Sequence, residues 1–518
     1  AWGQRGHHGD GRTAARMDSS GVLGWSMTHY TARPVGAAAP DPHLHTHLSL
    51  ANMIRGRDGK WSAMAAGGRD LHRHSLAANM FLTARIRERT AAELGLRWEV
   101  DPRTNAWEVA AVPQGLRDLF SKRHGQIAAA EAAATEQGKT LSAGQRNLIA
   151  QRTARAKDTE AGLGDLRENW RAQAHAAGFD VDAIAHAATA KPSPAARSLL
   201  AALPAQRRGP DVEAIAQRIW DPETGLTAHR KDVDRSHLLA AVAAAAEGIE
   251  SLAQLDRLTD AVLAVPGYAL RLDSDLPGTL TGPERYTTVD IADAEQTILA
   301  AARDRFATNA AVVDAGLVAA AAETFAAARG FELSPEQRAV VDRLATAGHG
   351  VDAVIGVAGS GKTTSMEVLA AAHRAAGHTI AGASTAAVAA QHLQAETGIP
   401  SATVASWLSR IERGRGLAGL DVLMVDEAAM VDDRQMARLV AAASESGTQI
   451  IGIGDPRQLR SPGVGSTFAD VHELVDGLTL ADNRRQQHEA ERRALAAWRD
   501  DDTRAIFDVL AERDAVHA

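Results

Sequence analysis

Short apolar runs that each lead into glycine or a carboxylate recur through the last third of the chain. Residues 351–355, 423–425 and 449–453 are such runs, and the segment 366–373 between the first two is rich in helix-forming residues. Runs of this length that alternate with helical segments are typical of buried parallel strands. The pattern predicts a parallel α/β lobe over residues 331–518.

The front of the chain has a different pattern. From residue 41 to 54, polar and apolar residues alternate, which places His45, His47 and Ser49 on one face of a strand. The intervening residues Leu44, Leu48, Leu50 and Ile54 are expected to lie towards a core. An Asp58-Gly59 turn predicts a hairpin, and a helix is expected over about 71–94. The alanine-rich stretch 127–190 predicts helices, and 211–330 alternates helical patterns with turns.

Residues 356–364 read Gly-Val-Ala-Gly-Ser-Gly-Lys-Thr-Thr, a complete Walker A sequence between an apolar run and a helix. Its glycines let backbone N–H groups turn inward around phosphate oxygens, at the positive end of the helix. Lys362 is expected to reach the β- and γ-phosphates, and Thr363 to hold Mg²⁺. The alternative is a glycine-rich turn without a ligand. The predicted ATP-binding set here is Gly356, Gly359, Ser360, Gly361, Lys362, Thr363 and Thr364.

Three further segments follow in order, each at the end of a predicted strand. Asp426 is expected in the Mg²⁺ shell, and Glu427 is expected to orient and deprotonate the attacking water. Gln458 could respond to the γ-phosphate, and an arginine at 484–485 could neutralise the transferring phosphoryl group. Each segment alone occurs often by chance, whereas the ordered set predicts an ATP hydrolase.

This ordered set resembles the RecD-like branch of superfamily 1 DNA helicases over residues 331–490. Residues 333–337 resemble the Q motif, which implies that Gln337 recognises adenine. Residues 383–393 resemble motif Ia and 403–408 the next DNA-contacting segment, although 386–388 lack the basic residue that members often carry. The resemblance implies that Arg485, which directly precedes Gln486, is the catalytic arginine. It also implies 5′-to-3′ movement on single-stranded DNA.

The front strand carries a second candidate chemistry. His45 and His47, two residues apart, can reach one metal ion, each through a neutral imidazole nitrogen. His29, at the end of the strand-like segment 22–29, is a third candidate ligand, and His43 shares the face of His45. The alternative is a set of solvated or hydrogen-bonded histidines, because a chain with 20 histidines brings some together by chance.

Residues 29–33 (His-Tyr-Thr-Ala-Arg) and 41–47 (Asp-Pro-His-Leu-His-Thr-His) resemble the histidine triad of the MobF-type conjugative relaxases, the TrwC, TraI and TraA group. The spacer between the two segments is longer than the common form. The resemblance implies that His29, His45 and His47 hold a divalent cation that polarises the scissile phosphate, with His43 at a variable position. Fusion to a RecD-like helicase is itself the signature of this family. It implies single-stranded DNA at a plasmid transfer origin as partner, together with conjugative coupling and accessory proteins.

Composition adds limits. The chain has 518 residues, no cysteine and a formal net charge of −8, and it has no run of 18 apolar residues. We expect a cytoplasmic protein without membrane insertion. The family's nucleophilic tyrosines lie upstream of the histidine motif, whereas the tyrosines here are Tyr30, Tyr268 and Tyr286. We therefore expect a fragment without that region and without the second helicase lobe, incomplete in both activities.

The predicted fold is multidomain: a relaxase domain over 1–125 with an antiparallel sheet and helices, a helical region over 126–210, a small helicase N-terminal domain over 211–330, and a RecA-like P-loop lobe over 331–518. The predicted function is a metal-dependent DNA relaxase joined to an ATP-dependent helicase. The alternatives are a RecD-like repair helicase with an unrelated front domain, and a noncatalytic DNA-binding remnant.

Overall fold

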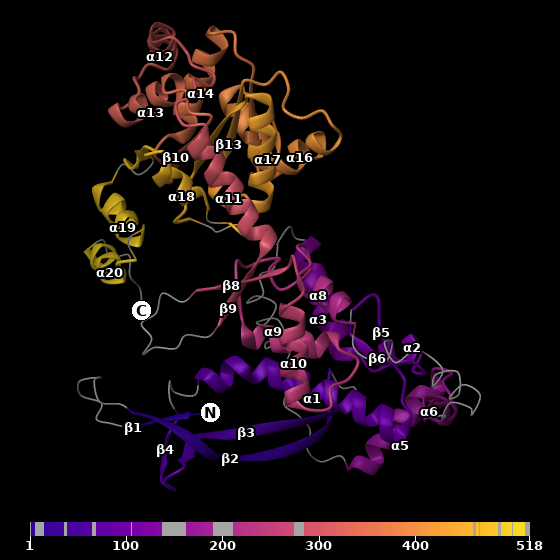
Figure 1. The fold of residues 1–518 in the computed structure, drawn as a ribbon. Coiled ribbons are helices and arrows are strands. Elements are labelled where there is room, and N and C mark those ends of the chain that lie inside the picture. Colours follow the sequence, from indigo (N-terminus) through magenta and orange to yellow (C-terminus); the bar gives the residue numbers. More distant parts are fainter. Residues whose placement is uncertain are drawn as a thin grey trace. The chain divides into compact units, whose positions relative to one another are not determined.

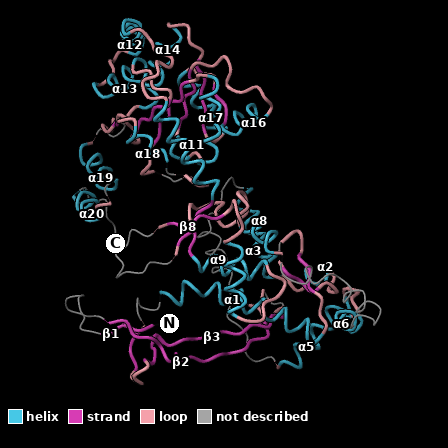
Figure 2. Tube along the Cα trace, viewed as in Figure 1, coloured by secondary structure: helices cyan, strands magenta, loops and turns pink. Residues whose placement is uncertain are grey.

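The computed structural model describes residues 2–5, 15–35, 39–64, 69–104, 106–136, 162–189, 211–273, 284–458, 461, 463–465, 467–484, 488–499 and 501–512. The chain divides into two compact units, one of residues 1–215 with 236–262 and one of residues 216–235 with 263–518. Both units combine helices and strands (Figure 2). This division differs from the predicted domain boundaries near 125, 210 and 330, which stay predictions.

An antiparallel sheet begins the first unit. It consists of β1 (Trp2–Arg5), β2 (Ala15–Thr31), β3 (Pro42–Gly56) and β4 (Trp61–Ala63), in that order (Figure 1). The β3–β4 connection has Gly59 at φ +78°, a left-handed conformation that glycine adopts without strain. The Gly56 N–H donates to the Lys60 carbonyl across this turn, so the hairpin predicted from Asp58-Gly59 is confirmed.

The predicted core face of β3 is only partly correct. Ile54 is fully buried, but Leu44 and Leu48 are 72% and 68% exposed. Alternation along a strand shows which residues share a face, but it does not show that the apolar face is covered.

The helices of the first unit include α1 (Arg69–Leu94), α2 (Gln114–Leu119), α3 (Lys122–Glu136), α5 (Leu163–Ala176), α6 (Val181–Thr189), α9 (Arg235–Ala245) and α10 (Leu252–Leu263), with the hairpin β5 (Trp98–Val100) and β6 (Trp107–Val109). The buried Arg87 of α1 donates to the Ala243, Ala246 and Glu247 carbonyls at the C-terminal end of α9. Burial lowers the pKa of Arg87 to about 10, so the group stays cationic at neutral pH and complements the helix dipole.

The second unit is built on a parallel sheet, as predicted. Its strand order is β12 (Ser401–Thr403), β11 (Ile380–Ser384), β13 (Val422–Asp426), β14 (Gln449–Gly454), β10 (Val351–Gly356) and β15 (Thr479–Leu480). All five neighbouring pairs in this sheet are parallel. The carboxyl ends of these strands therefore meet at one edge, where ligands bind in open α/β sheets.

Helices cover both faces of this sheet (Figure 1). One core includes residues of α11 (Val289–Asp304), α16 (Val404–Glu412), α17 (Asp433–Ser446) and α18 (Thr467–Leu474). The other includes α12 (Ala315–Arg329), α13 (Pro335–Thr346), α14 (Lys362–Ala375) and α15 (Ala387–Thr397). Within β13, Leu423 and Val425 enter the first core, whereas Val422 and Met424 enter the second. Since α11 and α12 precede residue 331, helices from before the predicted boundary also pack on this sheet.

Smaller elements complete the second unit. A short sheet has the order β7 (Val233–Asp234), β9 (Arg285–Thr288) and β8 (Ala269–Leu272), and α8 (Val212–Ile219) precedes it. The 3₁₀ turn η3 (Ala428–Met430) follows β13, and α19 (Glu489–Arg499) and α20 (Thr503–Glu512) come last. None of the helices in the described ranges is long and apolar enough to cross a membrane.

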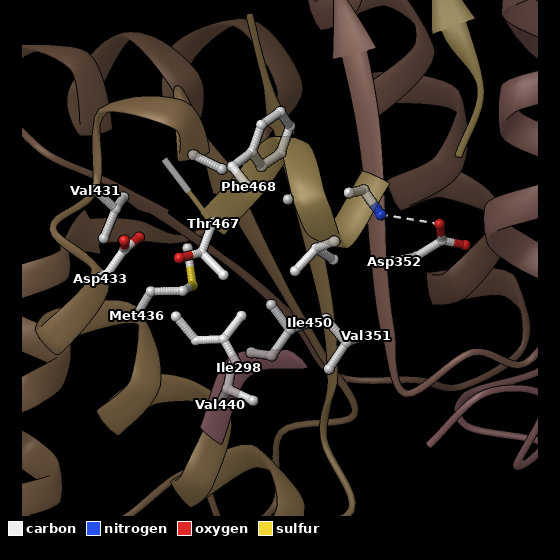
Figure 3. A pocket seen from close by; sticks show the side chains of 14 residues that line it. Ile298, Val351, Asp352, Val431, Asp433, Met436, Val440, Ile450, Thr467 and Phe468 are labelled. Atoms are coloured by element: carbon white, nitrogen blue, oxygen red, sulfur yellow. Dashed lines mark hydrogen bonds between the residues drawn. The ribbon is translucent and has the colours of Figure 1, made fainter. Parts of the chain in front are cut away.

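A cavity of about 30 Å³ lies in the first core, lined by residues such as Ile298, Val440 and Phe468 (Figure 3). Asp352 also lines it, and one of its carboxylate oxygens accepts from the Ala353 N–H, the dashed line in Figure 3. This volume leaves room for about one water molecule. The cavity is a packing feature of the core, and the candidate nucleotide site lies elsewhere, at the edge of the sheet.

Candidate functional site

The Walker A segment forms a tight loop between β10 and α14. Gly359 and Gly361 have φ of +81° and +80°, and Gly361 is the residue before the first turn of α14. A Cβ on Gly361 would lie 2.2 Å from Gln337 Nε2, and one on Gly356 would lie 2.4 Å from Lys362 Cδ. A side chain at either position would displace Lys362 or Gln337, and the left-handed backbone at Gly361 also disfavours other residues. Lys362, Thr363 and Thr364 follow in the first turn of the helix, where backbone N–H groups favour an anion.

Gln337 is buried beneath this loop. Its Oε1 accepts from the Ser334 N–H at 3.0 Å, and its Nε2 donates to the Ser360 carbonyl at 3.1 Å. The Ser334 side chain in turn accepts from the Gln337 N–H, which completes a capping box at the start of α13. The amide oxygen thus caps α13, and the amide nitrogen holds the Walker A loop. Recognition of adenine by Gln337 stays a prediction. The sequence analysis did not predict the capping box, although Ser-Pro-Glu-Gln has the spacing that such a box requires.

The two predicted carboxylates lie at the end of β13. Lys362 Nζ is 3.0 Å from Glu427 Oε1, and the two side chains are 15% and 32% exposed. Burial, and then the neighbouring charge of Glu427, raise the pKa of Asp426, while the charge of Lys362 opposes the shift. A cation placed beside Asp426 would relieve this unfavourable burial of negative charge. The donor set suits Mg²⁺, which prefers oxygen ligands.

The remaining predicted residues follow the neighbouring strands. Gln458, after β14, donates from Nε2 to Asp455 Oδ2 at 3.1 Å. After β15, the Arg484 N–H donates to the Gly359 carbonyl at 2.8 Å, and Asn483 Nδ2 donates to the Ala358 carbonyl at 3.0 Å. The segment that leads to the predicted catalytic arginine therefore lies against the Walker A loop. Arg485 itself lies outside the described residues, so its role stays a prediction.

The segment expected to contact DNA next is largely internal. Trp407 is 5% exposed, and its Nε1 donates to the Gly382 carbonyl at 3.0 Å. The Arg410 guanidinium covers the indole, 4.4 Å from its centroid. In this conformation the tryptophan stabilises the lobe, and its ring is not available to stack on a base. Val388, in the segment that resembles motif Ia, is 73% exposed.

Four histidines gather on one face of the front sheet. His29 of β2 is the direct cross-strand partner of His45 in β3, with ring centroids 5.4 Å apart. The His47 ring is 5.0 Å from His29 and 5.1 Å from His45. The three predicted ligands are thus mutual neighbours. His43 stacks on His45 at 4.5 Å, so spacing alone does not separate it from the triad.

His45 has a second contact that bears on its chemistry. Its Nδ1 lies 2.9 Å from the His43 carbonyl, which favours the tautomer with a proton on Nδ1. In that tautomer the lone pair of Nε2 is the one that could bind a metal ion. Nevertheless, within the described part of the chain no three His, Cys, Asp or Glu side chains are arranged to hold a metal ion. Metal binding at this cluster stays a prediction.

Two family models match separate parts of the chain. Residues 4–177 match the TrwC relaxase family, and residues 332–518 match an AAA domain family. The first range contains the histidine cluster and the second contains the whole Walker site. The chain is thus similar to a TrwC relaxase in its first part and to an AAA domain in its last part, which supports the resemblance to MobF-type relaxase-helicases.

Its relatives include conjugal transfer proteins. TraA of Rhizobium radiobacter is 39% identical over 165 residues, which are 31% of this chain and 15% of that protein. TraA of Agrobacterium fabrum (strain C58) is 35% identical over 229 residues, 43% of this chain and 20% of that protein. Among solved structures, the conjugative relaxase TrwC in complex with mutant oriT DNA is 24% identical, covering 35% of this chain and 60% of that one with a TM-score of 0.28. The matched stretches thus span a fifth or less of the TraA relatives.

Proposed function

We propose that the second unit is an ATP-dependent motor that moves 5′ to 3′ on single-stranded DNA. The observation that carries this proposal is the ion pair of Lys362 with Glu427, beside Asp426, at the edge where the parallel strands end. A lysine of this kind binds the β- and γ-phosphates in P-loop enzymes, and the carboxylates bind Mg²⁺ and activate water. Here Lys362 and Glu427 lie within contact of one another, and Asp426 directly precedes Glu427.

The ion pair also suggests an order of events. On binding of Mg·ATP, Lys362 exchanges Glu427 for phosphate oxygens, and the released Glu427 carboxylate can accept a proton from water. The water oxygen bonds to the γ-phosphorus, the bond to the β–γ bridging oxygen breaks, and ADP and phosphate leave. Glu427 is therefore the proposed general base, with Gln458 and Arg485 at the γ-phosphate.

For the first unit, we propose a DNA strand-transfer site at the histidine cluster. It is supported by the mutual proximity of His29, His45 and His47, and by the match to the TrwC relaxase family. A divalent cation bound there would withdraw electron density from a scissile phosphate. The chain's own contribution is to hold three imidazoles on two paired strands, and the His43 carbonyl favours the His45 tautomer with a proton on Nδ1. The proposed substrate is single-stranded DNA at a plasmid transfer origin.

The proposal for the motor is tested by ATP hydrolysis with and without single-stranded DNA, followed by strand separation on duplexes with a 5′ or a 3′ tail. Lys362→Ala should lower ATP affinity by a hundredfold or more, because one ammonium with its phosphate hydrogen bonds is lost. Equal ATP affinity for the wild type and Lys362→Ala in calorimetry would refute the nucleotide site. Separation of the 3′-tailed duplex alone would refute the proposed polarity.

An alternative function is a repair helicase with an unrelated front domain. The match of residues 4–177 to the TrwC relaxase family does not favour it. Titration of Mn²⁺ into the wild type, His45→Ala and His43→Ala distinguishes a relaxase from a repair helicase. Metal binding that depends on His45 supports the relaxase, and its absence in the wild type would remove support for the proposed cation.

A further inference from the structure

Asp455 is a buried carboxylate near the candidate nucleotide site. It follows β14 directly, and its side chain is 0% exposed. Oδ1 accepts from the Arg457 N–H at 3.0 Å, and Oδ2 accepts from Gln458 Nε2 at 3.1 Å and from Arg499 Nη1. Burial acts to raise the pKa of Asp455, but the hydrogen bonds from Arg499, Arg457 and Gln458 outweigh it and lower the pKa. The group is therefore an anion in the folded chain.

Arg499 comes from a distant part of the sequence. It is the last residue of α19, and the Arg457 guanidinium donates back to its carbonyl at 3.5 Å. The loop after β14 and the end of α19 thus hold each other by two contacts in opposite directions. Before α19, the segment of residues 481–484 lies on the Walker A loop, with the Ala481 and Asp482 N–H groups each 3.1 Å from Glu336 Oε2.

Two donors share Asp455 Oδ2, and they differ in kind. Arg499 is a cation and compensates the buried charge, whereas the Gln458 amide is neutral and adds one hydrogen bond. If Gln458 were the only side-chain donor, turning it towards a phosphate would leave a buried carboxylate poorly compensated, which is costly. With Arg499 in place, the amide can leave Asp455 while the carboxylate stays paired.

We propose that Arg499 is a positioning residue for recognition of the γ-phosphate: by pairing with Asp455, it allows Gln458 to exchange that carboxylate for the nucleotide, and it links α19 to the nucleotide state. The inference rests on the proposed motor function. It assigns a role to a residue 41 positions after Gln458, which acts through Asp455 and does not touch the nucleotide itself.

The test compares two nucleotides on the full chain. Calorimetry gives the dissociation constants of ATPγS and ADP, each with Mg²⁺, for the wild type, Arg499→Met, Arg499→Lys and Gln458→Ala. Arg499→Met should reduce the preference for ATPγS over ADP by about tenfold, as expected when one hydrogen bond to a charged group is lost. Affinity for ADP should change by less than about twofold. Arg499→Lys keeps the charge and should recover most of the preference.

Further variants separate positioning from general stability. Arg492→Met is the matched control, because Arg492 is an exposed arginine of the same helix, and its preference should equal that of the wild type. Gln458→Ala should lose the same preference, and adding Arg499→Met to it should cause little further loss, since both act through one contact.

The outcomes are distinguishable. Equal losses of ATPγS and ADP affinity in Arg499→Met would show a merely structural role, and an unchanged preference would overturn the inference while leaving the nucleotide site intact. Should Arg499→Met not fold, Arg499→Lys decides, because a preference no better than that of Gln458→Ala would also overturn it. No ADP binding by the wild type would refute the motor function and this inference together.

Discussion

Replacing Glu427 by glutamine should tighten nucleotide binding while it stops hydrolysis. The wild-type carboxylate lies 3.0 Å from Lys362 Nζ and competes with phosphate for that ammonium. Both side chains are partly shielded from water, so the net value of this pair is about 1 kcal/mol, between an exposed ion pair and a buried one. Glutamine has the same shape but no charge. Lys362 is then released at little cost, and affinity for Mg·ATP should rise about fivefold, the factor that corresponds to about 1 kcal/mol.

A second effect acts in the same direction. The charge of Glu427 is the second cause, after burial, of the raised pKa of Asp426. Removing it makes the Asp426 carboxylate easier to ionise and so more available to Mg²⁺. Loss of the general base should meanwhile lower the rate of hydrolysis by a hundredfold or more.

The assay is calorimetry with Mg·ATPγS together with steady-state phosphate release. Glu412→Gln is the matched control: it makes the same change of charge at an exposed residue of α16 that pairs with Arg438, and it should alter neither quantity. Weaker nucleotide binding by Glu427→Gln, or hydrolysis close to that of the wild type, would refute the roles assigned to this ion pair.

Two other predictions concern histidines. His45→Ala should abolish tight Mn²⁺ binding by the full chain and His43→Ala should reduce it slightly, as titration calorimetry would show; the reverse order would mean that His43 is the ligand. Burial, and then the charge of His378, lower the pKa of His373 to about 4. The unfolded chain takes up a proton near pH 6.5 and the folded chain only near pH 4, so stability should fall by about 3 kcal/mol as the pH drops through this window. Between pH 7.5 and 5.5, the free energy of unfolding measured in urea should fall less for His373→Gln than for the wild type. An equal fall in both proteins would contradict the lowered pKa of His373.

The sequence predicted best where one local pattern fixes both structure and chemistry. The Walker A loop needs glycine at Gly359 and Gly361 for its backbone, and the same residues bring N–H groups to a phosphate. The apolar runs predicted the parallel strands because strands buried on both faces have no polar side. The sequence indicated His29, His45 and His47 as candidate ligands, and the structure shows that His29 pairs across the strands with His45.

Contacts between distant segments were beyond such patterns. Nothing near Arg499 indicates that it pairs with Asp455, because the contact depends on where α19 lies after the chain has passed over the Walker loop. The exposure of Leu48 was missed for a related reason, since a strand pattern does not say what covers it. Trp407 belongs to the segment that resembles a DNA-contacting motif, and its side chain is buried in the core. A resemblance does not show which side chains of a segment are exposed, and DNA contact by this segment stays a prediction.

The strand β13 ends at Asp426, directly before Glu427, and both of its faces are packed against other parts of the lobe. Each of Val422, Leu423, Met424 and Val425 fills one of two different cores. No position in this run can change freely, and a slip by one residue would exchange the two sets of side chains. Substitutions in this strand would therefore disturb one of the cores, and with it the position of Asp426 and Glu427. Substitutions that alter nucleotide binding without disturbing the cores are therefore expected in the loops after the strands, where Gln458 and residues 481–484 lie.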